Sequence, residues 1–205
     1  MATPERPGIA ETLGGPLGIA ETSLPAVAFV VAYTISGSDV TLSATVAVVV
    51  AVGFAAWRLL RRESPRNVVS SIAGVALAAF IATRSGKAED FFLPGLLANA
   101  AYASAFLISI LVGWPLVGVI VGALDGEGNS WRGDPVRTRV FVLATWVWVV
   151  LFSLRLVVQL PLYLAGDVVA LGVARTAMGL PLFALGLWIT WRLVHRPAAD
   201  TTADP

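Results

Sequence analysis

The chain has 205 residues, of which 57% are hydrophobic and only 13% are charged, against about 25% charged in an ordinary soluble domain. This composition predicts a protein of the lipid bilayer, and the net charge of +1 gives no basis for binding nucleic acid. The absence of cysteine excludes disulfides, thiolate nucleophiles and cysteine metal ligands.

The first 23 residues are expected to form a cytoplasmic or interfacial segment. Charged residues, prolines and glycines interrupt them, and there is no apolar core of signal-peptide length, so we expect no cleaved signal. The next apolar run, residues 24–35, is shorter than the roughly 17 to 25 residues that a spanning helix needs. It crosses only if the helix extends back to Pro16 and includes Glu21 and Pro25, which predicts a short or kinked first helix.

Further apolar runs approach or exceed the length of a spanning helix. They are residues 40–60, 68–83, 91–112, 140–165 and 168–194. Another run, 115–124, follows Gly113 and Trp114 and is too short to cross, which predicts an interfacial or re-entrant segment. We therefore expect an all-α transmembrane helical bundle over residues 24–194, with about six crossings, and a disordered C-terminal tail over residues 195–205.

The positions of the basic residues predict the orientation of this bundle, because cytoplasmic loops are rich in Lys and Arg. Six crossings place nine arginines on one side, whereas the opposite connections carry only Arg84 and Lys87, beside Glu89 and Asp90. We therefore expect a multi-pass protein of the bacterial cytoplasmic membrane with both termini in the cytoplasm. The cytoplasmic arginines are Arg58, Arg61, Arg62, Arg66, Arg132, Arg137, Arg139, Arg192 and Arg196.

Two stripes of small residues predict close contacts between helices. Small side chains four positions apart lie on one helix face and let neighbouring backbones approach in lipid. The first stripe is Ser70, Gly74, Ala78 and Ala82, and the second is Gly118, Gly122 and Gly126.

Two arginines lie inside predicted spans, where charged side chains are rare and face a protein interior or a water-filled cavity. Arg155 lies in the run 140–165, and Gln159 and Tyr163 follow it at intervals of one helical turn on the same face. Arg175 lies eight residues into the last run. Both are therefore candidate ligand-binding residues.

A third helix adds polar groups at the same depth. Asn99 lies eight residues into the run 91–112, with Tyr102 close to the same face. At a rise of 1.5 Å per residue, Asn99 and Arg175 are each about 12 Å from the outer ends of their helices, and Arg155 is similarly deep. The sequence predicts one polar layer in the outer half of the membrane.

Glu89, Asp90 and Asp167 are the expected charge partners of this layer, since an isolated buried guanidinium is costly. If they pair with the arginines in a dry core, the layer fixes the packing of the bundle. If the arginines instead line a cavity, they are available to an external carboxylate or phosphate. A third alternative is that Arg155 reaches the outer interface by snorkelling.

The sequence gives little sign of catalysis. His195 is the only histidine, beside Arg192 and Arg196 at the end of the last run. There is no histidine–carboxylate metal spacing, no specific phosphate loop and no serine with a credible base. We expect no enzymatic activity, no catalytic residues, no cofactor and no metal. The charged loop 125–139 is either a solvated connection or a docking surface for a soluble partner.

Four sequence features carry a resemblance to a known family. They are the run from Arg84 through Glu89-Asp90-Phe91-Phe92-Leu93-Pro94 to Gly95, then Gly113-Trp114-Pro115-Leu116, then Gly126-Glu127-Gly128 with Trp131-Arg132, and finally Arg155 with Gln159 and Pro161-Leu162-Tyr163. Together they resemble an actinobacterial integral membrane protein family of unknown function, over residues 14–194. More distantly, the order of segments is similar to that of the bacterial intracellular septation protein A family of inner-membrane proteins.

These resemblances imply a role for the protein but assign no binding or catalytic residues. The first family implies no activity, and the second implies a part in cell-envelope or septum organisation through contacts with other membrane proteins. We therefore expect a non-enzymatic scaffold or accessory of the cell-envelope machinery. Its expected partners are the lipid bilayer and other membrane proteins or further copies of itself. The alternative is a small transporter or channel with an anion-favouring site in the polar layer.

Overall fold

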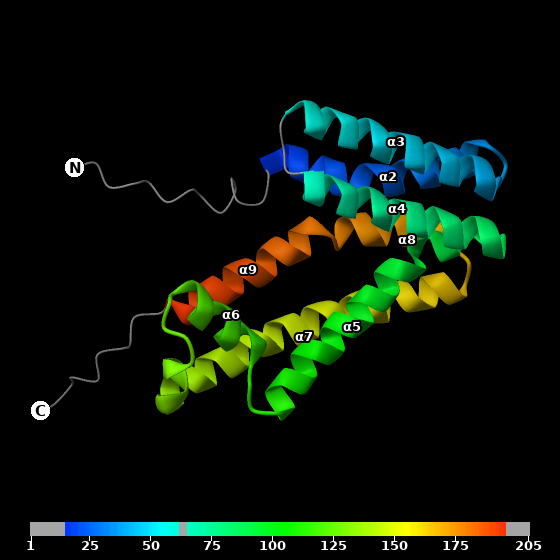
Figure 1. Cartoon of the computed structure of the whole chain (residues 1–205). Coiled ribbons are helices and arrows are strands. Elements are labelled where there is room, and N and C mark those ends of the chain that lie inside the picture. Colours follow the sequence, from blue (N-terminus) through cyan, green and yellow to red (C-terminus); the bar gives the residue numbers. More distant parts are fainter. Residues whose placement is uncertain (1–14, 62–64, 196–205) are drawn as a thin grey trace, which may run out of the picture. The chain divides into compact units, whose positions relative to one another are not determined.

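The protein is helical throughout the residues that its structure, a computed structural model, describes, namely 15–61 and 65–195 (Figure 1). Every regular element in these ranges is an α-helix or a short 3-10 helix, so the predicted all-α class is confirmed for them. The expected N-terminal segment up to residue 14 and the expected tail from residue 196 lie outside the described residues.

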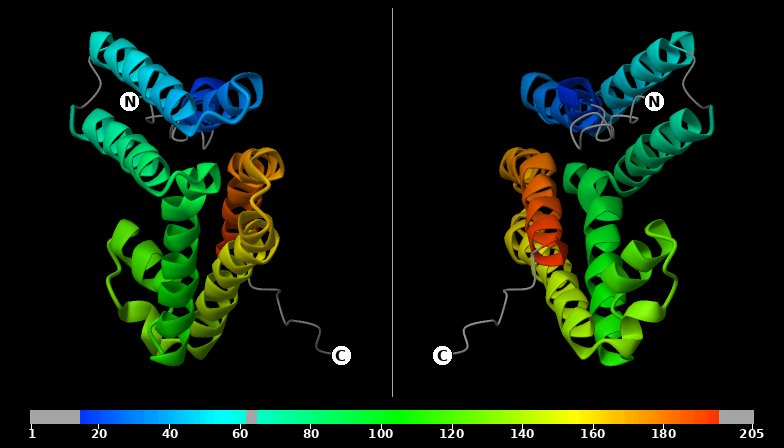
Figure 2. Two further views of the ribbon diagram at one scale, coloured as in Figure 1. Left: turned by 90° about the vertical axis from the view of Figure 1, so that its right-hand side faces the viewer. Right: turned by 90° about the vertical axis from the view of Figure 1, so that its left-hand side faces the viewer.

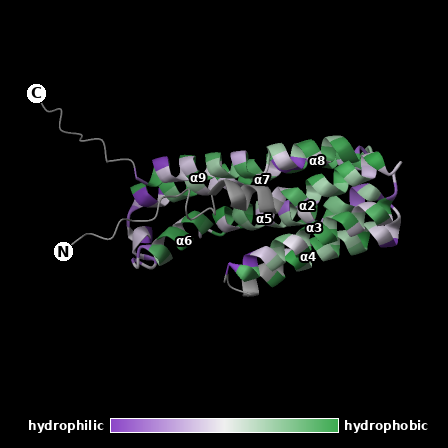
Figure 3. Cartoon of the chain, turned by 90° about the horizontal axis from the view of Figure 1, so that it is seen from above, coloured by the Kyte–Doolittle hydropathy of each residue, from purple (hydrophilic) through white to green (hydrophobic). Residues whose placement is uncertain are grey.

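Four helical stretches of the described chain are long and apolar enough to cross a membrane, as expected of a membrane protein. The other two predicted runs correspond to the shorter apolar helices Ser23–Ile35 and Ser71–Ser85, so six crossings stay a prediction. Hydrophobic residues cover most of each helix, and hydrophilic residues gather mainly at helix ends (Figure 3). The four long stretches are Val40–Leu60, Ala88–Leu111, Pro135–Leu164 and Val168–Val194.

The chain forms two compact units, and helices α5 and α7 contribute to both. The first unit comprises residues 1–96 and 158–180, and the second comprises residues 97–157 and 181–205. The first holds α2 (Gly15–Ile35), α3 (Val40–Leu60), α4 (Pro65–Ser85), η1 (Ala88–Phe92), the start of α5 (Leu93–Leu111), the end of α7 (Pro135–Leu164) and α8 (Val168–Ala177). The second holds the rest of α5 and α7, together with α6 (Leu116–Leu124), η2 (Ser130–Gly133) and most of α9 (Leu180–Val194).

In the first unit, α2 is longer than its apolar run alone predicts. It begins at Gly15, includes Pro25 and has 21 residues, so the extension that a crossing would need is present. The turn after α2 uses Gly37 at a φ of +69°, and Asp39 caps α3 by accepting a hydrogen bond from the Leu42 amide at 3.0 Å. Helices α2, α3 and α4 then pack side by side in chain order (Figure 2).

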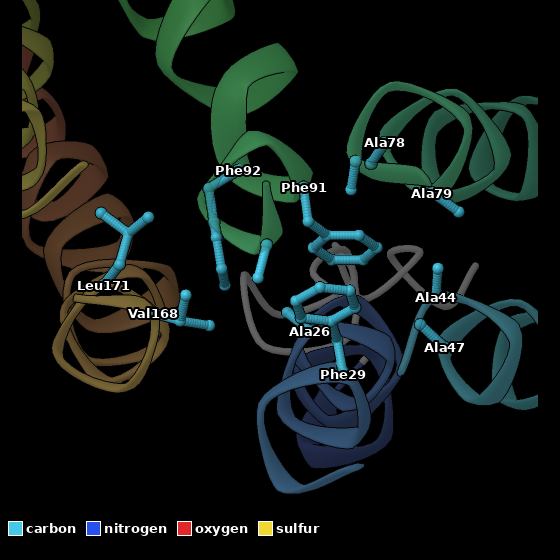
Figure 4. Packing of buried hydrophobic residues seen from close by; sticks show 12 residues of the cluster. Ala26, Phe29, Ala44, Ala47, Ala78, Ala79, Phe91, Phe92, Val168 and Leu171 are labelled. Carbon is cyan, nitrogen blue, oxygen red and sulfur yellow. The ribbon is translucent and has the colours of Figure 1, made fainter. Parts of the chain in front are cut away.

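The core of the first unit is an aromatic stack surrounded by small residues (Figure 4). The rings of Phe29 and Phe91 stack with their centres 4.1 Å apart, and Phe92 meets Phe29 edge-on at 6.2 Å. Because the surrounding side chains on α3 and α4 are alanines, these helices approach the stack closely. The other core residues are Ala26, Ala44, Ala47, Ala78, Ala79, Ala82, Ala88, Val168 and Leu171.

The predicted small-residue contact on α4 holds at Ala78 and Ala82, which are buried in this core. Gly74 on the same stripe differs, because no atom lies within 4 Å of the position that its Cβ would occupy. The side chain of Ser70 lies outside the described part of the structure. The stripe therefore packs at one end and leaves open space further along α4.

In the second unit, α6 packs on η2 through the second predicted stripe. A Cβ at Gly118 would lie 3.0 Å from the Trp131 ring, and one at Gly122 would meet the Gly128 carbonyl oxygen, so the close approach is confirmed at both glycines. Gly126 was expected to continue the stripe but serves a turn instead, with a φ of +72° and open space around it. Helix α6 has 9 residues, about 13 Å, which agrees with a segment too short to cross.

The last predicted run forms two helices rather than one. Helix α8 ends at Ala177 and α9 begins at Leu180, so the break falls at Met178 and Gly179. Pro181 explains it, because a proline lacks the amide hydrogen of a helix interior and its ring excludes the carbonyl four residues earlier. In the first turn of a new helix the same proline is tolerated.

Candidate ligand cavity

A cavity of about 390 Å³ lies within the first unit, among α2, α3, α4, the start of α5 and α8. Its volume falls within the range of roughly 300 to 1,000 Å³ that is typical of sites for small molecules. It lies next to the aromatic core, because Phe91 belongs to both the core and the cavity lining. The cavity is therefore large enough to hold a small ligand.

Two opposing helices supply the long walls of the cavity. On each helix the lining residues recur at intervals of three or four, so they form one face. The face on α3 extends over eight residues, from Ala51 to Arg58, or about 10 Å along its axis. The alanine and glycine residues on these two faces leave much of the cavity volume open, since larger side chains at the same positions would fill it. The lining residues are Ala51, Phe54, Ala55 and Arg58 on α3, and Ser71, Gly74, Val75 and Ala78 on α4.

Arg58 and Ser71 mark the end of the cavity that is nearest to the connection between α3 and α4. Arg58 lies in the last turn of α3, half-buried, and its guanidinium places positive charge at this end. At the opposite end of the α3 face, Ala51 is buried. The walls formed by α3 and α4 therefore have a polar end and a longer apolar part.

Arg175 brings a second positive charge to the cavity, from α8. Its guanidinium is held against the first turn of α5, where a Cβ at Gly95 would lie 2.6 Å from Nη1. Cζ of Arg175 also lies 5.7 Å from the centre of the Phe92 ring, a cation–π distance. Only glycine at residue 95 leaves room for this position of the guanidinium. The arginine that the sequence singled out as a ligand-binding candidate thus lines a cavity.

Comparison with known protein families shows to which family the chain belongs. Residues 13–201 match a family whose description is protein of unknown function, DUF3159. The chain belongs to the DUF3159 family. The predicted membership of a family of unknown function is confirmed, while the actinobacterial origin and the similarity to septation protein A stay predictions. Comparisons with curated proteins and with solved structures found no match.

In this DUF3159 protein, two predicted site residues of the first unit contact each other. The Tyr163 hydroxyl, near the end of α7, donates a hydrogen bond to Oδ1 of Asp90 in η1 at 2.5 Å. Asp90 is buried, with 8% of its surface exposed. Gln159, one turn before Tyr163, is also buried, and Glu89 beside Asp90 is half-buried. The first unit therefore contains a buried carboxylate held by a tyrosine.

Asp167 has a local role. Its carboxylate caps α8 by accepting a hydrogen bond from the Ala170 amide at 2.9 Å, and the residue is exposed. An N-cap of this kind satisfies a backbone donor that the first turn would otherwise leave without a partner. The described contact of Asp167 is thus with its own helix.

The remaining predicted site residues of this DUF3159 protein lie in the second unit. They are Asn99 and Tyr102 on α5 and Arg155 on α7. Tyr102 is 54% exposed and its ring lies 5.2 Å from that of Phe152, whereas Arg155 is half-buried. The structure therefore divides the predicted polar layer between the units, with Arg175, Gln159 and Tyr163 in the first.

Sequence reasoning missed the contribution of α3 and α4 to the candidate site. The sequence pattern predicts for Arg58 only a place on the cytoplasmic side, and it predicts no role for Ser71. A signal was present, because Ala51, Ala55 and Arg58 share one face of their helix. In the described part of the chain, no three His, Asp or Glu residues are grouped as a metal site would require.

Proposed function

We propose that this DUF3159 protein is a small, non-enzymatic transporter or channel of the bacterial cytoplasmic membrane that binds an anion in the cavity of its first unit. The observation that carries the proposal is that Arg175, a charged residue within an apolar stretch long enough to cross a membrane, lines a cavity of about 390 Å³. Charged residues are costly in a membrane span, and those that face a cavity mark substrate and ion pathways.

The chemistry of arginine supports an anionic ligand. The guanidinium stays charged at all physiological pH values and offers five N–H donors in a planar fork that matches a carboxylate or a phosphate. Arg175 also interacts within the chain. Its several donors allow one guanidinium to serve an internal partner and a ligand together. Hydrogen bonds to an anion are strengthened further where water is excluded.

The experiment is a binding measurement on the full-length protein in nanodiscs of neutral lipid. Radiolabelled acetate, dodecanoate and inorganic phosphate are the probes, and empty nanodiscs give the background. We expect at least one probe to bind, and Arg175→Gln to weaken that binding by about tenfold or more. Arg84→Gln is the matched control, because Arg84 is exposed on α4 and stacks on Phe80 outside the cavity.

The scaffold role in the cell envelope is the competing proposal, with other membrane proteins or further copies of the chain as partners. It predicts that none of the probes binds and that Arg175→Gln changes assembly or stability only. Binding that is equal in the wild type and in Arg175→Gln would also reject the cavity as the anion site. Size-exclusion chromatography of both variants checks that they remain folded.

A further inference from the structure

The walls of the cavity are too apolar for a small hydrated anion alone. Most of the lining is hydrocarbon, and an anion that leaves water for such a surface loses hydration that the surface does not replace. An apolar chain behaves in the opposite way, because it has no such hydration to lose and gains dispersion contacts with the hydrocarbon of the walls. The described polar side chains of the lining are Arg58, Ser71 and Arg175.

The backbone of the long walls does not compensate for this. The lining residues of α3 and α4 lie within helical segments, where each amide hydrogen bonds to the carbonyl four residues earlier. These amides are therefore unavailable to a ligand. Recognition of charge along these walls depends on side chains, whereas the alanine and glycine positions recognise only shape and apolar character.

We propose that the ligand of the cavity is an amphipathic acid, a molecule with one carboxylate or phosphate group and one apolar chain. This inference rests on the proposed function and names the chemical class of its ligand. The acidic group binds the Arg175 guanidinium, and the chain lies along Ala51 and Ala55 of α3 and Gly74 and Ala78 of α4. A volume of about 390 Å³ is near the lower end of the small-molecule range, which favours one chain over the two of a phospholipid.

Gly74 gives a direct test of where the chain lies. No atom lies within 4 Å of the position of a Cβ on Gly74, so a larger side chain at this position enters the cavity without a clash at its Cβ. Gly74→Leu therefore fills space that the ligand chain needs and leaves Arg175 in place. Gly74→Ala adds a single methyl group and serves as a milder variant if the leucine disturbs folding.

Gly53 provides a matched control. It lies on α3, it also has no atom within 4 Å of a Cβ, and it is not part of the cavity lining. Gly53→Leu thus makes the same chemical change in a neighbouring helix outside the site. Both substitutions remove a helix-interior glycine, so their effects on helix propensity are comparable.

The experiment compares acetate, octanoate, dodecanoate and dodecyl phosphate on the wild type and the variants in neutral nanodiscs. Partition of longer chains into lipid is the same for every variant, so variants are compared at each chain length. After the binding to empty nanodiscs is subtracted at each chain length, we expect the wild type to bind at least one dodecyl acid more than tenfold more tightly than acetate. Gly74→Leu should lose at least tenfold of this affinity and Gly74→Ala a smaller factor, whereas Gly53→Leu should bind as the wild type does.

The outcomes separate this inference from the proposed function. Binding of acetate as tight as that of the dodecyl acids, with sensitivity to Arg175→Gln, rejects the amphipathic ligand but keeps the anion site. Unchanged dodecanoate binding in folded Gly74→Leu also rejects the inference. If no acid and no inorganic phosphate binds the wild type, both proposals fail. The preference between dodecanoate and dodecyl phosphate identifies the acidic group.

Discussion

Gly95 and Arg175 are fitted to each other, because a Cβ at residue 95 would lie only 2.6 Å from Nη1 of the arginine. Gly95→Ala should therefore displace the guanidinium while the fold survives, since the clashing atom ends a flexible side chain. We expect binding of the anionic ligand to weaken about tenfold, with a midpoint of thermal unfolding equal to or above that of the wild type. Titration of labelled dodecanoate and a thermal melt on the same sample measure both effects.

Gly53→Ala is the control for that substitution, because its Cβ meets open space. It makes the same gain in helix propensity without touching the arginine. Equal affinity in Gly95→Ala and Gly53→Ala would contradict a binding role for the observed position of the guanidinium.

The hydrogen bond from Tyr163 to buried Asp90 predicts a loss of stability in Tyr163→Phe. Removing the hydroxyl leaves the carboxylate without one of its donors, and an unsatisfied buried group costs about 1 to 3 kcal/mol. We expect a lower midpoint of thermal unfolding and little change in ligand affinity. Tyr102→Phe is the control, since Tyr102 is 54% exposed and should lose much less. Equal midpoints for the two variants would argue against this hydrogen bond.

The packing of α6 predicts that Gly122→Ala is strongly destabilising. The added methyl group would overlap the Gly128 carbonyl oxygen, a backbone atom that moves only if the whole turn moves. We expect a loss of about 1 to 3 kcal/mol, as for other overpacked sites, measured by denaturation in detergent. Gly133→Ala should be close to neutral, because nothing lies within 4 Å of its Cβ. A neutral Gly122→Ala would contradict the close packing of α6 against the Gly128 carbonyl.

The orientation of the chain is testable by cysteine labelling, since the natural sequence contains no cysteine. The six-crossing prediction puts Ser85 on the outer side and Ser130 in the cytoplasm, and both residues are exposed. An impermeant maleimide should therefore label Ser85→Cys in intact spheroplasts and Ser130→Cys only after the membrane is opened. The reverse pattern would overturn the topology, and labelling of both residues from outside would overturn the number of crossings.

The lengths of apolar runs predicted the helices well, because the bilayer imposes length and hydrophobicity on whatever crosses it. The same signal did not predict the break at Met178 and Gly179, since hydropathy is insensitive to the hydrogen bond that Pro181 cannot make. The small residues on α6 were recognisable as a packing face, and Gly118 and Gly122 do pack closely. Gly126 looked the same in sequence, but its φ of +72° serves a turn.

The candidate site was only partly predictable, for a related reason. A charged residue within a span is conspicuous by itself, and Arg175 was found in this way. A cavity forms where small side chains on two neighbouring helices leave space between them. Which faces of α3 and α4 point toward each other depends on tertiary packing, which hydropathy does not predict. The sequence pattern therefore predicts that Gly74 and Ala78 both contact a neighbouring helix, although Gly74 borders open space.

The break in the last apolar stretch has an electrostatic consequence for Arg175. Helix α8 ends at Ala177, which puts Arg175 in its last turn. The aligned peptide dipoles of a helix give its C-terminus a partial negative charge, which stabilises a nearby cation by about 0.3 to 1 kcal/mol. In an unbroken helix Arg175 would lie mid-span without this field. Pro181, by ending α8 where it does, helps the membrane interior to tolerate a positive charge.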